Sequence, residues 1–186
     1  MRIDENKFIA ECTTYDFKRD VEDRKVRSWL KSVSAFANTE GGTLYFGVDN
    51  DANIVGVDNP QHTAEFISEK INAHLDPVPA FSLHPHRTND SKVVIELTVS
   101  AGDSVPYFLF IDGSRMAYVR KGNESVQTNS HELYNLVLKG SHRSWDSLVT
   151  NETRSKYSFA YLQAEYNERS GAKWEENLLL SFGLVT

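Results

Sequence analysis

One stretch of the sequence, residues 24–48, constrains the fold most because it specifies a helix, a break and a strand in succession. Apolar residues recur in its first part at three- and four-residue intervals, which is the spacing of one face of a helix about four turns long: Val26, Trp29, Leu30, Val33, Phe36 and Ala37. Gly41-Gly42 ends this helix, and Thr43 to Val48 then form a nearly all-apolar strand. Such a strand is covered on both faces, so we expect it at the centre of a sheet.

Shorter patterns around this stretch predict the rest of the domain. β-Branched and aromatic residues favour strands at 13–18, 54–57, 81–86, 92–99, 107–111 and 116–120. The 54–57 strand is predicted to form a hairpin with 43–48, and Asp112-Gly113 a turn between the last two strands. Helical spacing indicates helices at 61–75 and 131–138, with Asp23 and Ser130 as candidate N-caps of the first and last helices. We therefore expect an α+β fold, a mixed β-sheet flanked by helices.

A change of composition at Gly140 predicts three regions along the chain. Residues 1–139 form the domain, the polar stretch 140–155 is a linker, and 156–186 is a small helical appendage with patterns at 156–167 and 173–181. The appendage ends on a strongly apolar run. We interpret it as the start of a truncated next region, so that the C-terminal region of the full-length chain would be a partner of this domain.

Bulk composition excludes several functional classes. The chain has 186 residues and a single cysteine, Cys12, which excludes an intrachain disulfide and a multi-cysteine zinc site and favours a cytoplasmic location. No apolar run is long enough to span a membrane, so we expect no membrane contact. The net charge is −6, so nucleic acid cannot be bound through overall charge. Any such contact requires a local basic patch or a bridging metal ion.

Several motifs together resemble the Schlafen AlbA-type family, which is associated with DNA binding. These are Glu11 five residues before Asp16-Phe17-Lys18, the run from Ala35 to Asp49, Ile54-Val55-Gly56-Val57-Asp58, Pro106-Tyr107, and Tyr118-Val119-Arg120-Lys121-Gly122. The resemblance covers about residues 8–138, and residues 140–186 are similar to the segment that follows this domain in bacterial RecG-helicase-related regulators. It implies a nucleic-acid-binding module of a bacterial regulator, acting on DNA or RNA. The chain contains no Walker-type nucleotide-binding run.

The resemblance also implies a candidate acidic site. Glu11, Asp16 and Asp49 resemble the three-carboxylate site of the RNA-cleaving Schlafen proteins, in which Mg²⁺ or Mn²⁺ would activate water for phosphodiester cleavage. Metal-dependent endoribonuclease activity is therefore an alternative function. The nucleases carry their third acid where this chain has Asn50. Glu11 and Asp16 would face opposite sides of a regular strand and converge only if the chain bends between them. Otherwise they are a cap and a surface charge, and Asp49 is a turn residue.

Basic residues cluster around the predicted first helix and near residue 120. The candidate phosphate contacts are Lys18, Arg24, Arg27, Arg120 and Lys121. The same residues could instead form a solvated face balanced by nearby acids. A further alternative function is protein interaction or oligomerisation, in which the apolar C-terminal segment forms a homodimer.

Overall fold

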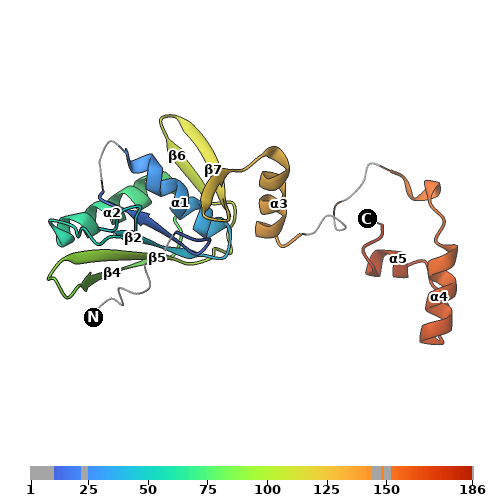
Figure 1. Cartoon of the computed structure of the whole chain (residues 1–186). Coiled ribbons are helices and arrows are strands. Elements are labelled where there is room, and N and C mark those ends of the chain that lie inside the picture. The colour runs from blue at the N-terminus through green and yellow to red at the C-terminus, as the bar shows by residue number, and fades with distance from the viewer. Residues whose placement is uncertain (1–10, 22–24, 144–147, 149–151, 186) are drawn as a thin grey trace. The chain divides into compact units, whose positions relative to one another are not determined.

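The computed structural model describes residues 11–21, 25–143, 148 and 152–185. The chain divides into two compact units, Met1–His142 and Arg143–Thr186 (Figure 1). This division falls inside the predicted linker 140–155. The boundaries at 139 and 155 stay predictions.

The first unit contains two four-stranded sheets. In the first sheet β1 lies parallel to β2, while β5 and β4 continue it antiparallel, so the order is β1 (Tyr15–Lys18), β2 (Gly42–Phe46), β5 (Val93–Val99), β4 (Phe81–Arg87). The second sheet is antiparallel throughout, in the order β3 (Leu75–Asp76), β6 (Phe108–Ile111), β7 (Ser114–Lys121), β8 (Glu124–Gln127). The predicted central position of the β2 strand is confirmed.

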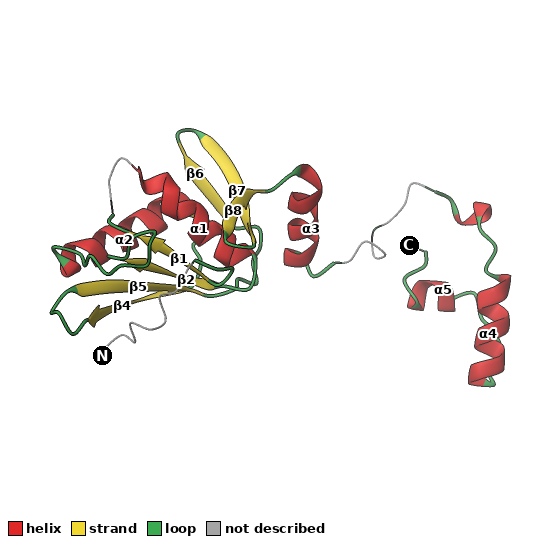
Figure 2. Ribbon diagram, in the orientation of Figure 1, coloured by secondary structure: helices red, strands yellow, loops and turns green. Residues whose placement is uncertain are grey.

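Helix α1 (Val26–Asn38) packs against strands of both sheets, as Figure 2 shows, and carries much of the core. Its predicted apolar face is buried, but so are Ser32, Ser34 and Asn38. A helix between two sheets has little surface left for water. Each buried polar side chain on it therefore needs a partner within the protein.

Two further helices complete the unit. Helix α2 (Pro60–His74) begins at Asn59, whose side chain accepts a hydrogen bond from the His62 backbone N–H. Helix α3 (Ser130–Gly140) begins with a capping box in which Asn129 and Glu132 each bond the other's backbone N–H. Asn129, not the predicted Ser130, is therefore the N-cap.

The α+β class is confirmed, with three differences in detail. The strands form two sheets because α1 separates them. The predicted hairpin of residues 54–57 with 43–48 is reduced to one bridge, Val48 to Ile54. The N–H groups of Val55 and Gly56 both donate to the Gly47 carbonyl, so these residues do not continue the strand pairing. Strands β3 and β8 are too short and too polar to show a pattern. The predicted cap Asp23 lies outside the described residues.

The second unit contains a short 3₁₀ turn, η4 (Arg154–Lys156), and helices α4 (Ala160–Ser170) and α5 (Leu178–Ser181). The rings of Tyr166, Trp174 and Phe182 pack together in it. Within the part of the chain that the structure describes, no helix is both long enough and apolar enough to cross a membrane.

Candidate functional site

The first unit contains a cavity of about 730 Å³. Strand β1, the first half of α1 and the β7–β8 hairpin line it. Its cationic residues are Lys18, Arg19, Lys25, Lys31 and Arg120, and its acidic residues are Glu11, Asp16, Asp20 and Glu124. The lining therefore holds one more cationic than acidic side chain, in a chain whose net charge is −6.

The chain bends between Glu11 and Asp16, as their convergence required. Cys12 and Tyr15 form an antiparallel bridge, so residues 12–15 reverse direction within four residues. Oε1 of Glu11 then accepts a hydrogen bond from the Phe17 backbone N–H at 3.0 Å. Glu11 thereby provides a hydrogen-bond acceptor for a backbone N–H of β1, which lies at the edge of its sheet and has a neighbouring strand on one side only.

Asp16 is buried and fully engaged. Its Oδ1 accepts a hydrogen bond from Lys18 Nζ at 2.6 Å, and its Oδ2 accepts one from Ser32 Oγ at 2.8 Å. Burial raises the pKa of Glu11, and the hydrogen bond with Asp16 raises it further. Burial also acts to raise the pKa of Asp16, but hydrogen bonds from Glu11, Lys18 and Ser32 outweigh it and lower that pKa. Asp16 is therefore the stronger acid of the pair and ionises before Glu11 as pH rises.

We predict that Glu11→Gln stabilises the protein at neutral pH. Because the Glu11 pKa is raised on folding, the protonated carboxyl stabilises the protein in acid. This contribution is lost as pH rises through the folded-state pKa of Glu11. The lowered Asp16 pKa acts oppositely, and its contribution is lost only as pH falls. Glutamine keeps both hydrogen bonds and cannot ionise, so the melting temperature should rise at neutral pH and match the wild type in acid.

Thermal unfolding across a pH series measures this difference. Glu40→Gln is the control, because Glu40 is exposed and lies outside the cavity. It should leave the melting temperature unchanged at every pH. A Glu11→Gln protein that melts below the wild type at neutral pH would show that the ionised Glu11 carboxylate stabilises the fold, contrary to the prediction.

Asp49 does not join the other two acids. Its Oδ1 accepts hydrogen bonds from the backbone N–H groups of Asp51 and Asn53, and its Oδ2 accepts one from Asn53 Nδ2. These bonds, with the backbone of Asn53 first, lower the pKa of Asp49. The residue that lines the cavity is its neighbour Asn50.

The residues present do not fit a Mg²⁺ or Mn²⁺ ion. Both oxygens of Asp16 have protein donors, and one of those donors is itself a cation, Lys18. Asn50 brings an amide and no charge. Among the described residues, no group of three His, Cys, Asp or Glu side chains is placed to hold a metal ion.

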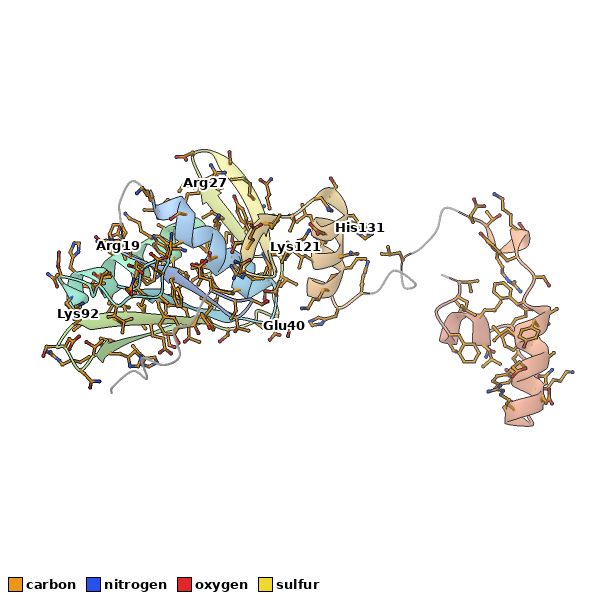
Figure 3. All side chains as sticks on the ribbon, in the orientation of Figure 1. Arg19, Arg27, Glu40, Lys92, Lys121 and His131 are labelled. Atoms are coloured by element: carbon orange, nitrogen blue, oxygen red, sulfur yellow. The ribbon has the colours of Figure 1, made fainter. Side chains whose placement is uncertain are left out.

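The predicted phosphate contacts are only partly brought together. Lys18 and Arg120 line the cavity. Arg27 lies outside it, with Nη2 3.2 Å from Met116 Sδ, and exposed Lys121 pairs with Glu132 at the start of α3; Figure 3 labels both side chains. Arg24 lies outside the described residues.

Arg120 is buried and bonded to the protein rather than open to solvent. Its Nε donates to the Thr13 carbonyl at 3.2 Å, and its Nη2 donates to the Cys12 carbonyl at 2.6 Å. Its Nη1 donates to Ser125 Oγ at 3.0 Å, and Ser125 in turn donates to Ser32 Oγ at 3.1 Å. Because Ser32 bonds Asp16, this network ties β7, β8, α1 and β1 into one floor for the cavity.

Three cations of this site, Arg19, Lys25 and Lys31, belong to the basic cluster around the first helix but were not among the predicted phosphate contacts. A signal was present for one of them, Lys25, which immediately precedes α1. Lys25, Ser28, Trp29 and Ser32 follow the three- and four-residue spacing of one helical face, and all four line the cavity. The basic face chosen from the sequence held Lys31, which lines the cavity, and Arg27, which does not; its third member, Arg24, falls outside the described residues.

Comparisons with known proteins agree with this architecture. Residues 11–129 match the family described as Schlafen, AlbA_2. The DIP2311 protein from Corynebacterium diphtheriae is similar in structure, with a TM-score of 0.52 and 19% identity, over 92% of this chain and 32% of that one. The N-terminal domain of a RecG-related protein from Nitrosomonas europaea matches with a TM-score of 0.46 and 21% identity, over 63% of this chain and 84% of that one.

The chain thus spans about a third of the length of the Corynebacterium diphtheriae protein. The family match extends from Glu11, at the start of the cavity, to the N-cap of α3. It includes the helix, the glycine exit and the central strand, and covers well over half of the sequence. The chain belongs to the Schlafen AlbA_2 family.

Proposed function

We propose that this domain binds nucleic acid, with the phosphate backbone lying in the cavity between β1, α1 and the β7–β8 hairpin. The observation that carries the proposal is that five cationic side chains, against four acidic ones, line one cavity of a chain with net charge −6. Local positive charge of this kind attracts polyanions even when overall charge does not. Membership of the Schlafen AlbA_2 family supports the same function.

Lys25 and Lys31 would supply affinity rather than sequence preference. Lys25 immediately precedes α1 and Lys31 lies within it; both line the cavity, and Lys31 is half-buried. Lysine contacts to phosphate release counterions and carry no information about the base. We therefore expect binding that weakens steeply with salt and depends little on sequence.

The test is a double substitution, Lys25→Ala with Lys31→Ala, measured by fluorescence anisotropy with labelled oligouridylate and oligothymidylate. At low salt the double variant should bind at least about tenfold more weakly than the wild type. The slope of log affinity against log salt should become shallower by about 1.4, about 0.7 for each lysine removed, because both oligonucleotides are single-stranded.

Lys70→Ala is the matched control, since Lys70 is a half-buried helical lysine on α2 outside the cavity. It should leave affinity and salt slope unchanged. The proposal fails if the wild-type protein binds neither oligonucleotide at low salt. It fails equally if Lys70→Ala weakens binding as much as the double variant.

A further inference from the structure

The ammonium group of Lys18 is held in a fixed position at the cavity floor. Its Nζ donates to Asp16 Oδ1 at 2.6 Å and to the Phe17 carbonyl at 2.7 Å. An ammonium has three donors, so two of them fix the group and one remains. The Lys18 side chain keeps 22% of its surface exposed and lines the cavity, so the remaining donor has access to a ligand there.

This ammonium occupies the position beside Asp16 that a metal ion would need. A divalent cation bridging the acids would have to bond Asp16, yet one Asp16 oxygen is bonded to Lys18 and the other to Ser32. Oε1 of Glu11 is bonded to the Phe17 backbone N–H. The carboxyl pair therefore has a cation already, and that cation is part of the chain.

We propose that Lys18 is the resident cation of the cavity and binds a phosphate group of the ligand directly, so that nucleic-acid binding requires no divalent metal ion. This inference rests on the proposed function and names the contact at its centre. Asp16 anchors the ammonium and neutralises part of its charge. The surrounding cations, Arg19, Lys25 and Lys31, keep the cavity favourable to an anion.

The geometry suits a phosphodiester better than a neutral ligand. A charged donor and an anionic oxygen make a short, strong hydrogen bond, and its strength increases where protein walls exclude water. Ser32 and Ser125 each donate within the floor, whereas Lys18 has a third donor beyond the two that hold it in place. A phosphate bonded to Lys18 would lie within the cavity, with the neighbouring phosphates towards Lys25 and Lys31.

The experiment measures binding of labelled oligouridylate and oligothymidylate in two buffers, one with EDTA and one with MnCl₂. Wild-type affinity should be the same in both. Lys18→Ala should weaken binding about tenfold in EDTA, because one charged hydrogen bond to phosphate is lost. Lys18→Gln is the second variant. Its amide can still donate to Asp16 and thus hold the fold, but it lacks the charge, so it should lose affinity similarly.

Circular dichroism melting shows whether each variant is folded in the assay, and Lys70→Ala serves again as the control. Wild-type protein that binds only with Mn²⁺ would overturn this inference while leaving the proposed function standing. Lys18→Gln protein with wild-type affinity would do the same. Wild-type protein that binds in neither buffer would instead overturn the proposed function itself.

Discussion

Replacing Asn38 with alanine should lower the free energy of unfolding by about 3–4 kcal/mol. Asn38 is the last residue of α1 and is buried, with 2% of its surface exposed. Its Oδ1 accepts a hydrogen bond from the Tyr107 backbone N–H at 2.7 Å. Its Nδ2 donates to the carbonyls of Tyr107 and Tyr118, each at 3.0 Å. One side chain thus joins α1 to the start of β6 and to β7.

Alanine would leave these backbone groups buried without Asn38 as their partner. An unsatisfied buried donor or acceptor costs about 1–3 kcal/mol, more than an ordinary hydrogen bond contributes. The Tyr107 carbonyl also accepts from Ser34 Oγ at 2.8 Å, so the main loss falls on the Tyr107 N–H and the Tyr118 carbonyl. Two such groups account for the expected magnitude.

Urea unfolding followed by circular dichroism measures this loss. Asn72→Ala is the matched control, because Asn72 is also a helical asparagine that bonds a carbonyl, that of Ser68, but is exposed. It should cost less than about 0.5 kcal/mol. If Asn38→Ala costs no more than Asn72→Ala, the attachment of α1 to the second sheet does not depend on Asn38.

Asn38 also shows what the sequence pattern could and could not predict. Periodicity identified α1 and its apolar face correctly, because the face that meets the first sheet is made of large apolar residues. It could not identify Ser34 and Asn38 as buried, since polar residues on a helix usually face water. Their burial follows from the second sheet, whose strands lie about 70 to 80 residues further along the chain.

The site was predictable to a similar degree. The resemblance grouped Glu11, Asp16 and Asp49 as a site, and the structure places Glu11 and Asp16, with Lys18, at the cavity but not Asp49. The bridge between Cys12 and Tyr15, which makes Glu11 and Asp16 meet, leaves no periodic signal because it is a single tight reversal. The contribution of the β7–β8 hairpin depends on long-range packing. No local pattern could show that Arg120 would contact Cys12 and Thr13.

Replacing Arg120 should show whether its side chain is a buried structural link between segments or a contact to phosphate. Arg120 is 8% exposed and joins β7 to the carbonyls of Cys12 and Thr13, with its guanidinium carbon 4.9 Å from the centre of the Phe36 ring. Arg120→Ala should lower the free energy of unfolding by about 3 kcal/mol, because charged hydrogen bonds are lost and two carbonyls lose their donor. Oligonucleotide affinity should fall with it, since the segment carrying Glu11 loses its attachment.

The variant Arg120→Lys distinguishes a structural role of Arg120 from a phosphate contact. An ammonium is a single point of charge and cannot reach the carbonyls and Ser125 Oγ together, as the planar guanidinium does. Lysine should therefore recover little stability or affinity. Arg115→Ala is the control on the same strand, since Arg115 is exposed and its ion pair with Asp76 should contribute less than about 1 kcal/mol. If the Arg120→Lys protein binds with wild-type affinity in anisotropy, Arg120 acts through its charge on the ligand. A lysine can replace a phosphate contact, but it cannot replace the hydrogen bonds of the guanidinium to Cys12, Thr13 and Ser125.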